Sequence, residues 1–448
     1  MQPIESASPG AGGFRRELGL LDATVVVAGA IIGVGIFANP SNVARIVGDP
    51  SLILLSWVVG GLLAMLGGLA YAELGSRLPY VGGQYTYLAR TYHPAVGFLY
   101  GVALLFIVNG GGIAAVAIVF GGYLERSIPW LAAAGIRPMA AGVILALTGL
   151  HVVGVRAGKW ANNALMAAKL LGIAGLMLLV LQDGRPSASV FSLEPLLPPR
   201  VSSVPLVLTA LVPIMFAYGG WQNCGAMAGE IRDPARNLPL ANVLGVAVVV
   251  VLYIGLNVAY LLVLTPAEVA ASPALAADVA LVAAGPAGAR LVSALILVSC
   301  LGFLSVIILT GPRLYYAMAT DGVLFQRAGA LHPRFRTPAL ALWLQALVSV
   351  TLIATNTYDQ LLSYVVFADW LFFGLAVAGL FLLRRRQPAG PGIHAMPGHP
   401  FTTLVFVLAA AGIVVNSFFA YTAQSLVGSG ILLAGTAVYF LMSPARAR

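Results

Sequence analysis

Charged residues are scarce in this sequence. Only 9% of its 448 residues are Asp, Glu, Lys or Arg, whereas 60% are hydrophobic, and the mean hydropathy is +0.95. Soluble proteins carry about 25% charged residues, so this chain has too few to cover a water-facing surface. Apolar runs long enough to cross a hydrocarbon core of about 30 Å recur along its whole length. The composition predicts a polytopic, all-α membrane protein.

Cysteines are few, and the common catalytic motifs are missing. The two cysteines, Cys224 and Cys300, fall within predicted spans, which argues against a disulfide framework. The motifs HExxH, GxSxG and GxxxxGK[ST] are absent, and no polar stretch is long enough for a nucleotide-binding domain. The histidines lack metal-site spacing; they are His93, His151, His332, His394 and His399. We therefore expect neither an enzyme nor an ATP-driven pump, and no metal or cofactor.

Twelve apolar segments are long enough to span the membrane as helices. Five lie within residues 20–182, five more within 204–383, and the last two within 401–442. Their predicted limits are 20–46, 51–75, 95–123, 138–155, 160–182, 204–231, 239–264, 288–311, 338–356, 360–383, 401–421 and 425–442. Residues 1–19 show no signal-peptide pattern, so they are expected to form a cytosolic tail, as are residues 443–448.

The positions of Lys and Arg predict the orientation. With the N-terminus in the cytosol, predicted cytosolic segments hold 17 of the 24 Lys and Arg, and predicted external segments hold 6. This bias satisfies the positive-inside rule with both termini in the cytosol. The net charge of +9 therefore reflects topology, and no basic domain suggests nucleic-acid binding. We expect a location in the cell membrane, and the composition is compatible with a bacterial source.

The first and sixth predicted spans contain residues that weaken a helix at mid-membrane. Residues 29–40 read GAIIGVGIFANP, and residues 215–230 read MFAYGGWQNCGAMAGE. Because the two spans are five apart, the halves formed by spans 1–5 and 6–10 must run in opposite directions. Matched interruptions in inverted halves indicate a secondary transporter with a site near the membrane midplane. Glycines that merely allow close helix packing are the alternative.

An unwound helix offers backbone groups to a ligand. Amide hydrogens at one break could hold a carboxylate, and carbonyls at the other could hold an ammonium group, so a zwitterionic amino acid would satisfy both. Glycine lets the backbone touch the ligand directly. The predicted substrate-binding residues are Ile32, Gly33, Val34, Gly35, Phe216, Ala217, Gly219 and Gly220.

Three motifs resemble the amino acid–polyamine–organocation (APC) superfamily, and most closely its L-type amino acid transporter branch. They are GAIIGVGIFANP, AYAELGSRLPYVGGQYTYLARTY and FAYGGWQN…GEIRDPARNLPLAN. The resemblance covers about residues 18–386. It implies a LeuT-type 5+5 inverted repeat with discontinuous helices 1 and 6, plus two C-terminal helices. It also implies sodium-independent amino acid transport by alternating access, with the GxG loop at Gly33 and Gly35 on the carboxylate and Phe216 as a gate.

Two charged residues fall inside predicted spans. A lysine near the bilayer centre costs about 2.5–3.5 kcal/mol, so Lys169 should face the helix bundle. The resemblance implies that its ammonium replaces a sodium ion and bonds carbonyls of residues 28–31 and Ser299. Proton coupling and a permanently charged strut both remain open for Lys169. Asp369 could line the outer vestibule, attract cationic substrates, carry a proton or hydrogen-bond a neighbouring helix.

Other side chains are candidates for gates and pocket walls. Trp221 is expected to form an apolar wall and a second gate residue. Glu230 and Arg232 suggest a cytoplasmic gate, and Glu73 lies at the same predicted membrane face; a solvated interfacial cluster is the alternative. The glycines at 110–112 could leave room for a large apolar side chain or serve close packing.

The predicted function is an amino acid exchanger or proton-coupled symporter for neutral substrates, including large apolar ones. A cationic amino acid or polyamine antiporter and a transport-deficient sensor of the same fold are the alternatives. Eukaryotic L-type transporters bind a glycoprotein through a cysteine between spans three and four, and residues 124–137 contain none. We therefore expect no disulfide-linked glycoprotein partner.

Overall fold

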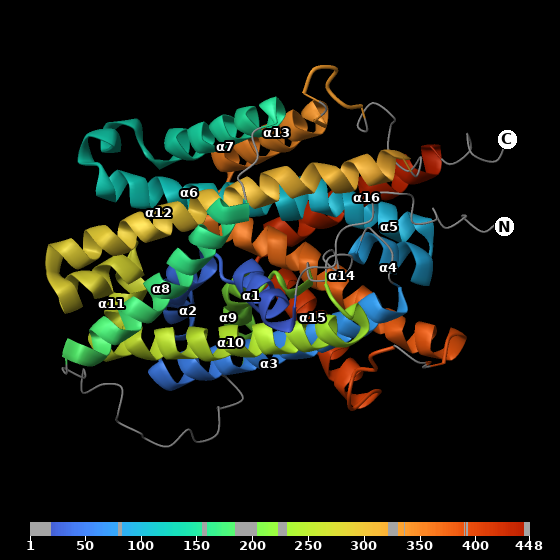
Figure 1. Cartoon of the computed structure of the whole chain (residues 1–448), viewed down its shortest axis with the longest axis horizontal. Coiled ribbons are helices and arrows are strands. Elements are labelled where there is room, and N and C mark those ends of the chain that lie inside the picture. The colour runs from blue at the N-terminus through green and yellow to red at the C-terminus, as the bar shows by residue number, and fades with distance from the viewer. Residues whose placement is uncertain are drawn as a thin grey trace.

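The computed structural model describes residues 19–78, 83–154, 159–183, 204–222, 231–320, 330–335, 337–388, 390 and 393–442. Throughout these ranges the regular elements are helices (Figure 1). In chain order they are α1 (Leu20–Ile31), α2 (Gly35–Val47), α3 (Pro50–Arg77), α4 (Gln84–Thr91), α5 (Pro94–Ala103), η1 (Leu104–Asn109), α6 (Gly110–Ser127), η2 (Pro129–Ala134), α7 (Ile136–Val153), α8 (Lys159–Asp183), α9 (Val204–Ala217), α10 (Pro234–Val263), α11 (Pro266–Ala271), α12 (Leu275–Thr320), α13 (Ala339–Thr355), α14 (Tyr358–Arg386), α15 (Phe401–Ala420) and α16 (Thr422–Met442).

The described helices match the apolar pattern of the sequence. Eight of them are long and apolar enough to cross a membrane, and α1 with α2 forms a ninth candidate bent by 46°. Three shorter apolar helices, Lys169–Leu181, Val204–Ala217 and Ala339–Thr355, coincide with three further predicted spans. The polytopic all-α class is confirmed, while twelve spans and an inverted repeat stay predictions.

Local sequence signals set several helix starts. Asp49 caps α3 by accepting a hydrogen bond from the Leu52 amide at 2.9 Å, and Pro50 occupies the first helical position, which needs no amide hydrogen. Thr265 with Glu268 forms a capping box at α11, and Thr357 with Gln360 forms one at α14. These caps satisfy amides that a helix start leaves without partners.

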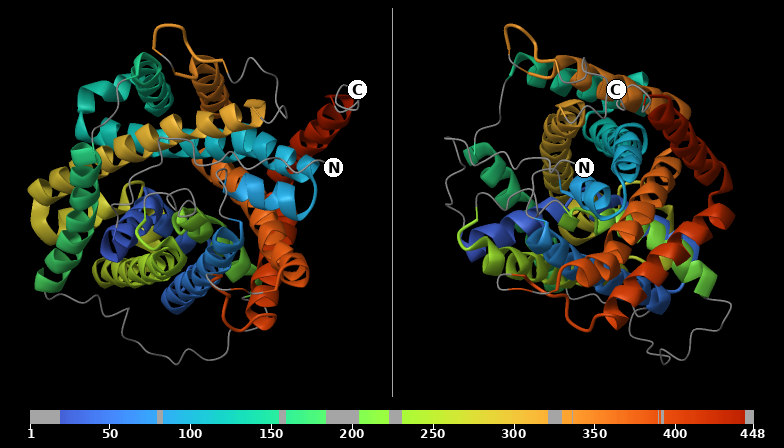
Figure 2. Two further views of the ribbon diagram at one scale, coloured as in Figure 1. Left: turned by 45° about the vertical axis from the view of Figure 1, so that its right-hand side comes forward. Right: turned by 90° about the vertical axis from the view of Figure 1, so that its right-hand side faces the viewer.

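The helices pack around the two short segments of the first span. α1 packs against α10, and α10 against α3, while α2 packs against α9. On the other side, α6 and α12 run side by side in Figure 1 and in both views of Figure 2, and α8 crosses α12 and α10. The break between α1 and α2 is therefore surrounded by helices that are far apart in sequence.

Two of the three glycines at 110–112 serve packing. A Cβ atom on Gly110 would lie 2.8 Å from Val348 Cγ1 of α13, and one on Gly111 would lie 2.8 Å from Val365 Cγ2 of α14. Only Gly112 has room, with Ile307 at 3.9 Å. Close helix contact thus explains Gly110 and Gly111.

Candidate functional site

The first predicted span is interrupted where the glycines predict it. α1 ends at Ile31 and α2 begins at Gly35. Ile32 has left the helical conformation, with φ −68° and ψ 91°, although its amide still donates to the Ala28 carbonyl at 2.8 Å. The three residues between the helices are buried. The backbone groups of this break therefore lie inside the bundle.

The sixth predicted span also leaves the helix at its glycine pair. α9 ends at Ala217, and a turn follows through Tyr218, Gly219 and Gly220. Gly220 has φ 125°, a conformation that L side chains rarely adopt. The Gly220 amide donates to the Gln222 side-chain oxygen at 2.8 Å. Residues 223–230, with the predicted gate residue Glu230, lie outside the described residues.

The two breaks touch through their backbones. A Cβ atom on Gly35 would lie 2.7 Å from Ala217 Cα, and one on Gly220 would lie 2.4 Å from the Ala30 carbonyl oxygen. No real Cβ atom tolerates such separations, so close approach of the two segments requires both glycines. Gly33 differs, because its nearest neighbour would be a Phe303 ring carbon at 3.7 Å.

A tyrosine from α10 joins the two breaks. The Tyr253 hydroxyl lies 3.2 Å from the Ile31 carbonyl oxygen and 3.3 Å from the Ala217 carbonyl oxygen. Ile31 and Ala217 are the last helical residues before the two breaks. Its ring is fully buried and packs against Trp57 and Tyr218 at centroid distances of 5.9 and 5.1 Å. Sequence reasoning missed Tyr253, because its role depends on which helices meet and no local motif marks it.

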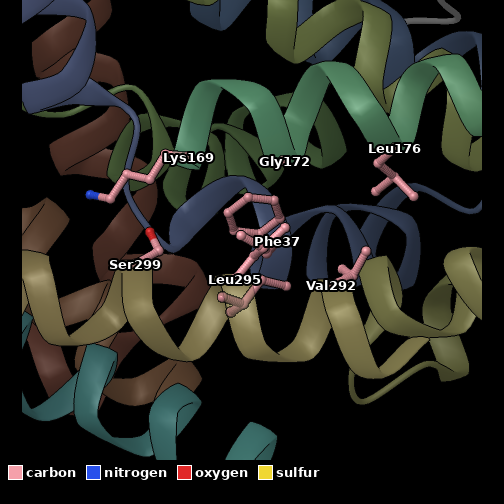
Figure 3. Close-up of a pocket in the computed structure, with 8 residues that line it drawn as sticks. Phe37, Lys169, Gly172, Leu176, Val292, Leu295 and Ser299 are labelled. Atoms are coloured by element: carbon pink, nitrogen blue, oxygen red, sulfur yellow. The ribbon is translucent and has the colours of Figure 1, made fainter. Parts of the chain in front are cut away.

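Lys169 reaches the first break, as predicted for a residue facing the bundle. Its Nζ atom lies 3.4 Å from the Ile32 carbonyl oxygen, one residue beyond the predicted carbonyls. Ser299 of α12 lines the same small pocket, and Figure 3 shows both side chains at one end of it, with Leu176 and Val292 at the other. The Ser299 hydroxyl is buried and has no hydrogen-bond partner within the described part of the chain.

The two predicted gate residues differ in their surroundings. Phe216 lies in the last turn of α9 and is half-buried. Trp221 is 2% exposed, and its ring packs against Tyr71 and Phe373 with both centroid distances at 4.9 Å. Trp221 is therefore packed between α3, α14 and α15, and its ring has no exposed face with which to close over a ligand.

Comparisons with known proteins identify the family of this chain. The amino acid permease family matches residues 18–442. The chain is 29% identical over 439 residues to the serine/threonine exchanger SteT of Bacillus subtilis (strain 168), covering 97% of this chain and 98% of that protein. It is 30% identical over 444 residues to the human large neutral amino acids transporter small subunit 2, covering 97% and 82%. It is 30% identical over 393 residues to the human b(0,+)-type amino acid transporter 1, covering 85% and 78%.

The chain belongs to the amino acid permease family. This finding confirms the resemblance to the APC superfamily and its L-type branch. The family and these relatives are transporters and not enzymes, which confirms the expectation from the missing catalytic motifs.

The remaining charged candidates of the permease lie apart from the two breaks. Asp369 is half-buried on α14, on the helix face of Phe372 and Phe373, which pack against Tyr100 and Tyr71. Among the described residues, the ion pairs of the permease do not include Asp369. Arg232 precedes α10, and its carbonyl accepts a hydrogen bond from the Asn237 side chain.

Glu73 of the permease is the centre of a buried ionic cluster. Its side chain is 0% exposed and accepts hydrogen bonds from Arg77 Nε at 2.6 Å, from Arg384 Nη2 at 2.6 Å and from the Met396 amide at 2.7 Å. Burial lowers the pKa of His399, and Arg384 nearby lowers it further. The cluster ties α3 to the end of α14 and to the segment before α15. Glu73 itself is therefore a buried structural residue, and the choice between a gate and a solvated cluster at Glu230 and Arg232 stays a prediction.

Proposed function

We propose that this protein is a sodium-independent secondary transporter that moves amino acids across the cell membrane by alternating access. Neutral amino acids, including large apolar ones, are the favoured substrates. The observation that carries the proposal is the direct contact of two broken helices at Gly35 and Gly220. The transport roles named for three relatives support the same substrate class.

The amides at the start of α2 are the favoured contacts for the substrate carboxylate. The Ile32 amide already bonds Ala28, the Phe37 amide bonds Val34, and the Gly33 backbone bonds the Tyr253 hydroxyl. The amides of Val34 and Gly35 are therefore better placed to bind, and Gly33 leaves space beside them because it has no side chain. A helix start with free amides attracts an anion. On the other segment, the Ala217 carbonyl faces Tyr253 at 3.3 Å, and the Phe216 carbonyl accepts from the Gly219 amide at 3.3 Å. A carbonyl oxygen has two lone pairs, so we assign the ammonium group to the carbonyls of Phe216 and Gly219, which are half-buried rather than buried.

Lys169 is proposed to stand where other transporters of this fold bind sodium. An ammonium group inside a bundle needs oxygen partners, and the break supplies the Ile32 carbonyl. Such a lysine can stay protonated throughout and stabilise the break, or it can release its proton during transport. Both possibilities are compatible with exchange, whereas proton symport needs a residue that changes its protonation state.

We further propose that both termini are cytosolic, so that the Val47 end of α2 faces outward, and that the protein acts without a disulfide-linked glycoprotein.

A second candidate function, exchange of cationic amino acids or polyamines, is favoured by one observation. Asp369 places a carboxylate inside the bundle without an ion-pair partner among the described residues.

Uptake of labelled leucine or serine into sodium-free proteoliposomes tests the proposal. Vesicles are either empty or preloaded with amino acids, each with and without an inward proton gradient. Uptake only into preloaded vesicles would identify an exchanger, and uptake driven by the gradient alone would identify a proton symporter. Uptake of arginine or a polyamine instead would favour the second candidate. A lack of uptake of any of these compounds would contradict transport.

A further inference from the structure

A second cavity lies away from the two helix breaks. It has a volume of about 230 Å³ and is lined by residues of α2, α9 and α14 and by Tyr421 between α15 and α16. Arg45, which lines it, is ten residues beyond Gly35, and this length of helix rises about 15 Å. In the proposed orientation this cavity lies at the outer end of the bundle. It is therefore distinct from the candidate site at the breaks.

Opposite charges face each other in this cavity. Arg45 Nη1 lies 3.4 Å from Asp359 Oδ2, and the two side chains are 53% and 51% exposed. Asn42 Nδ2 donates to Asp359 Oδ1 at 2.7 Å, and Arg45 Nε donates to the Ala270 carbonyl at 3.1 Å. An ion pair this long and this exposed contributes little to stability. Since a guanidinium has five N–H donors, Arg45 can bind a second carboxylate without giving up its bond to Ala270.

The rest of the lining is apolar. Val212 of α9 and Leu362 of α14 contribute aliphatic surface. The Tyr421 ring closes another side, and burial raises the pKa of its hydroxyl, with the Asp359 carboxylate adding to that rise. A cavity needs only about 10–15 Å³ by this measure to hold one water molecule, so a volume of about 230 Å³ has room for several waters or for one amino acid.

We propose that this cavity is a second amino acid site, which receives the substrate before it reaches the helix breaks. The α-carboxylate binds Arg45, the α-ammonium binds Asp359, and an aliphatic side chain lies against Val212 and Leu362. This inference rests on the proposed function, because it assigns the same substrate class. Binding replaces the direct pairing of Arg45 with Asp359, and so separates the end of α2 from the start of α14.

Transport kinetics measured from each side test the site. Arg45→Gln and Asp359→Asn should each raise the KM for external leucine about tenfold and leave the KM for internal leucine unchanged. Arg126→Gln is the matched control, because Arg126 also pairs with an aspartate, Asp278, outside the cavity. A rise in external KM for Arg126→Gln equal to that of Arg45→Gln, or equal changes on both sides for Arg45→Gln, would overturn the proposal.

Protection of a cysteine in the cavity distinguishes a binding site from an ion pair that only holds α2 against α14. Ile46→Cys, at a half-buried position that lines the cavity, is labelled with an impermeant thiol reagent in a Gly33→Val background, whose central site is disabled. Millimolar leucine should still slow labelling several-fold, and Arg45→Gln should remove this protection. Loss of protection in the Gly33→Val background, while the parent protein transports leucine, would overturn the second site alone. If the parent neither transports nor is protected by leucine, the proposed function itself fails.

Discussion

The backbone of Gly35 lies against Ala217 so closely that a Cβ atom on Gly35 would be 2.7 Å from Ala217 Cα and 2.9 Å from Ala217 Cβ. This contact joins the break of the first span to the break of the sixth. Glycine at 35 is therefore needed for packing, whatever it does for a ligand. A Cβ atom on Gly33, two residues earlier, would have no neighbour closer than 3.7 Å. The two glycines of the GxG loop thus differ in packing: Gly35 is needed for the helix contact, and Gly33 has the proposed function of leaving room for the carboxylate.

Valine substitutions should separate these two functions. Gly35→Val should destabilise the protein by at least about 1–3 kcal/mol, the usual cost of an overpacked core, because Ala217 cannot move away. Gly33→Val should fold normally and lose leucine binding, because a side chain would stand between the amides and the carboxylate. Thermal unfolding and leucine binding in detergent measure both effects. Normal leucine affinity of Gly33→Val would contradict the proposed carboxylate site.

Tyr253→Phe should weaken the link between the two breaks. It removes a hydroxyl that faces two buried carbonyls, which costs about 1–3 kcal/mol when they stay unsatisfied, while ring packing is kept. Tyr260→Phe on the same helix is the control, because the Tyr260 hydroxyl is buried without a partner in the described part of the chain. We expect a lower midpoint of thermal unfolding and slower transport only for Tyr253→Phe. Equal effects of both changes would show that Tyr253 has no special role.

Lys169→Ala should abolish transport or remove its dependence on pH. The ammonium lies 3.4 Å from the Ile32 carbonyl oxygen, so its loss leaves this carbonyl without a cationic partner at the break. Leucine exchange by Lys169→Ala is measured between pH 5 and 8. Ser299→Ala serves as a comparison in the same pocket, since its hydroxyl has no partner in the described structure. Wild-type exchange by Lys169→Ala at every pH would show that the lysine is dispensable.

The sequence predicts this site in part because broken helices leave a local signal. Glycines at 33, 35 and 220 mark the breaks, and an intramembrane lysine has to face the bundle, so both features were predictable. The bridge made by Tyr253 and the wedged position of Trp221 depend on contacts between distant helices, which no local pattern encodes. Glu73 pairs with Arg77 four residues away, but its second arginine partner, Arg384, is 311 positions away. For the same reason, the sequence could not distinguish glycines that pack from glycines that bind.

Phe216→Ala and Trp221→Ala should affect different quantities: the first should change turnover and the second should change stability. Phe216 is half-buried at the end of α9, so its truncation should slow turnover by weakening occlusion and change stability little. Trp221 fills a buried space against Tyr71 and Phe373, and truncating such a core aromatic costs about 3–5 kcal/mol. Single-turnover exchange and thermal unfolding, measured on both variants, give the two quantities. Unchanged turnover for Phe216→Ala would remove it as a gate.

Glu73→Gln should be among the most destabilising single changes in this chain. The substitution leaves Arg77 and Arg384 without their shared carboxylate in a buried setting, and breaking a buried ion pair from one side costs about 3–5 kcal/mol. Glu268→Gln is the matched control, because the Glu268 side chain is exposed on α11 and glutamine also completes a capping box. The midpoint of thermal unfolding should decrease strongly for Glu73→Gln and hardly at all for Glu268→Gln. If instead Glu73→Gln unfolds like the parent, Arg77 and Arg384 must find other acceptors, and the link from α3 to α14 does not depend on charge.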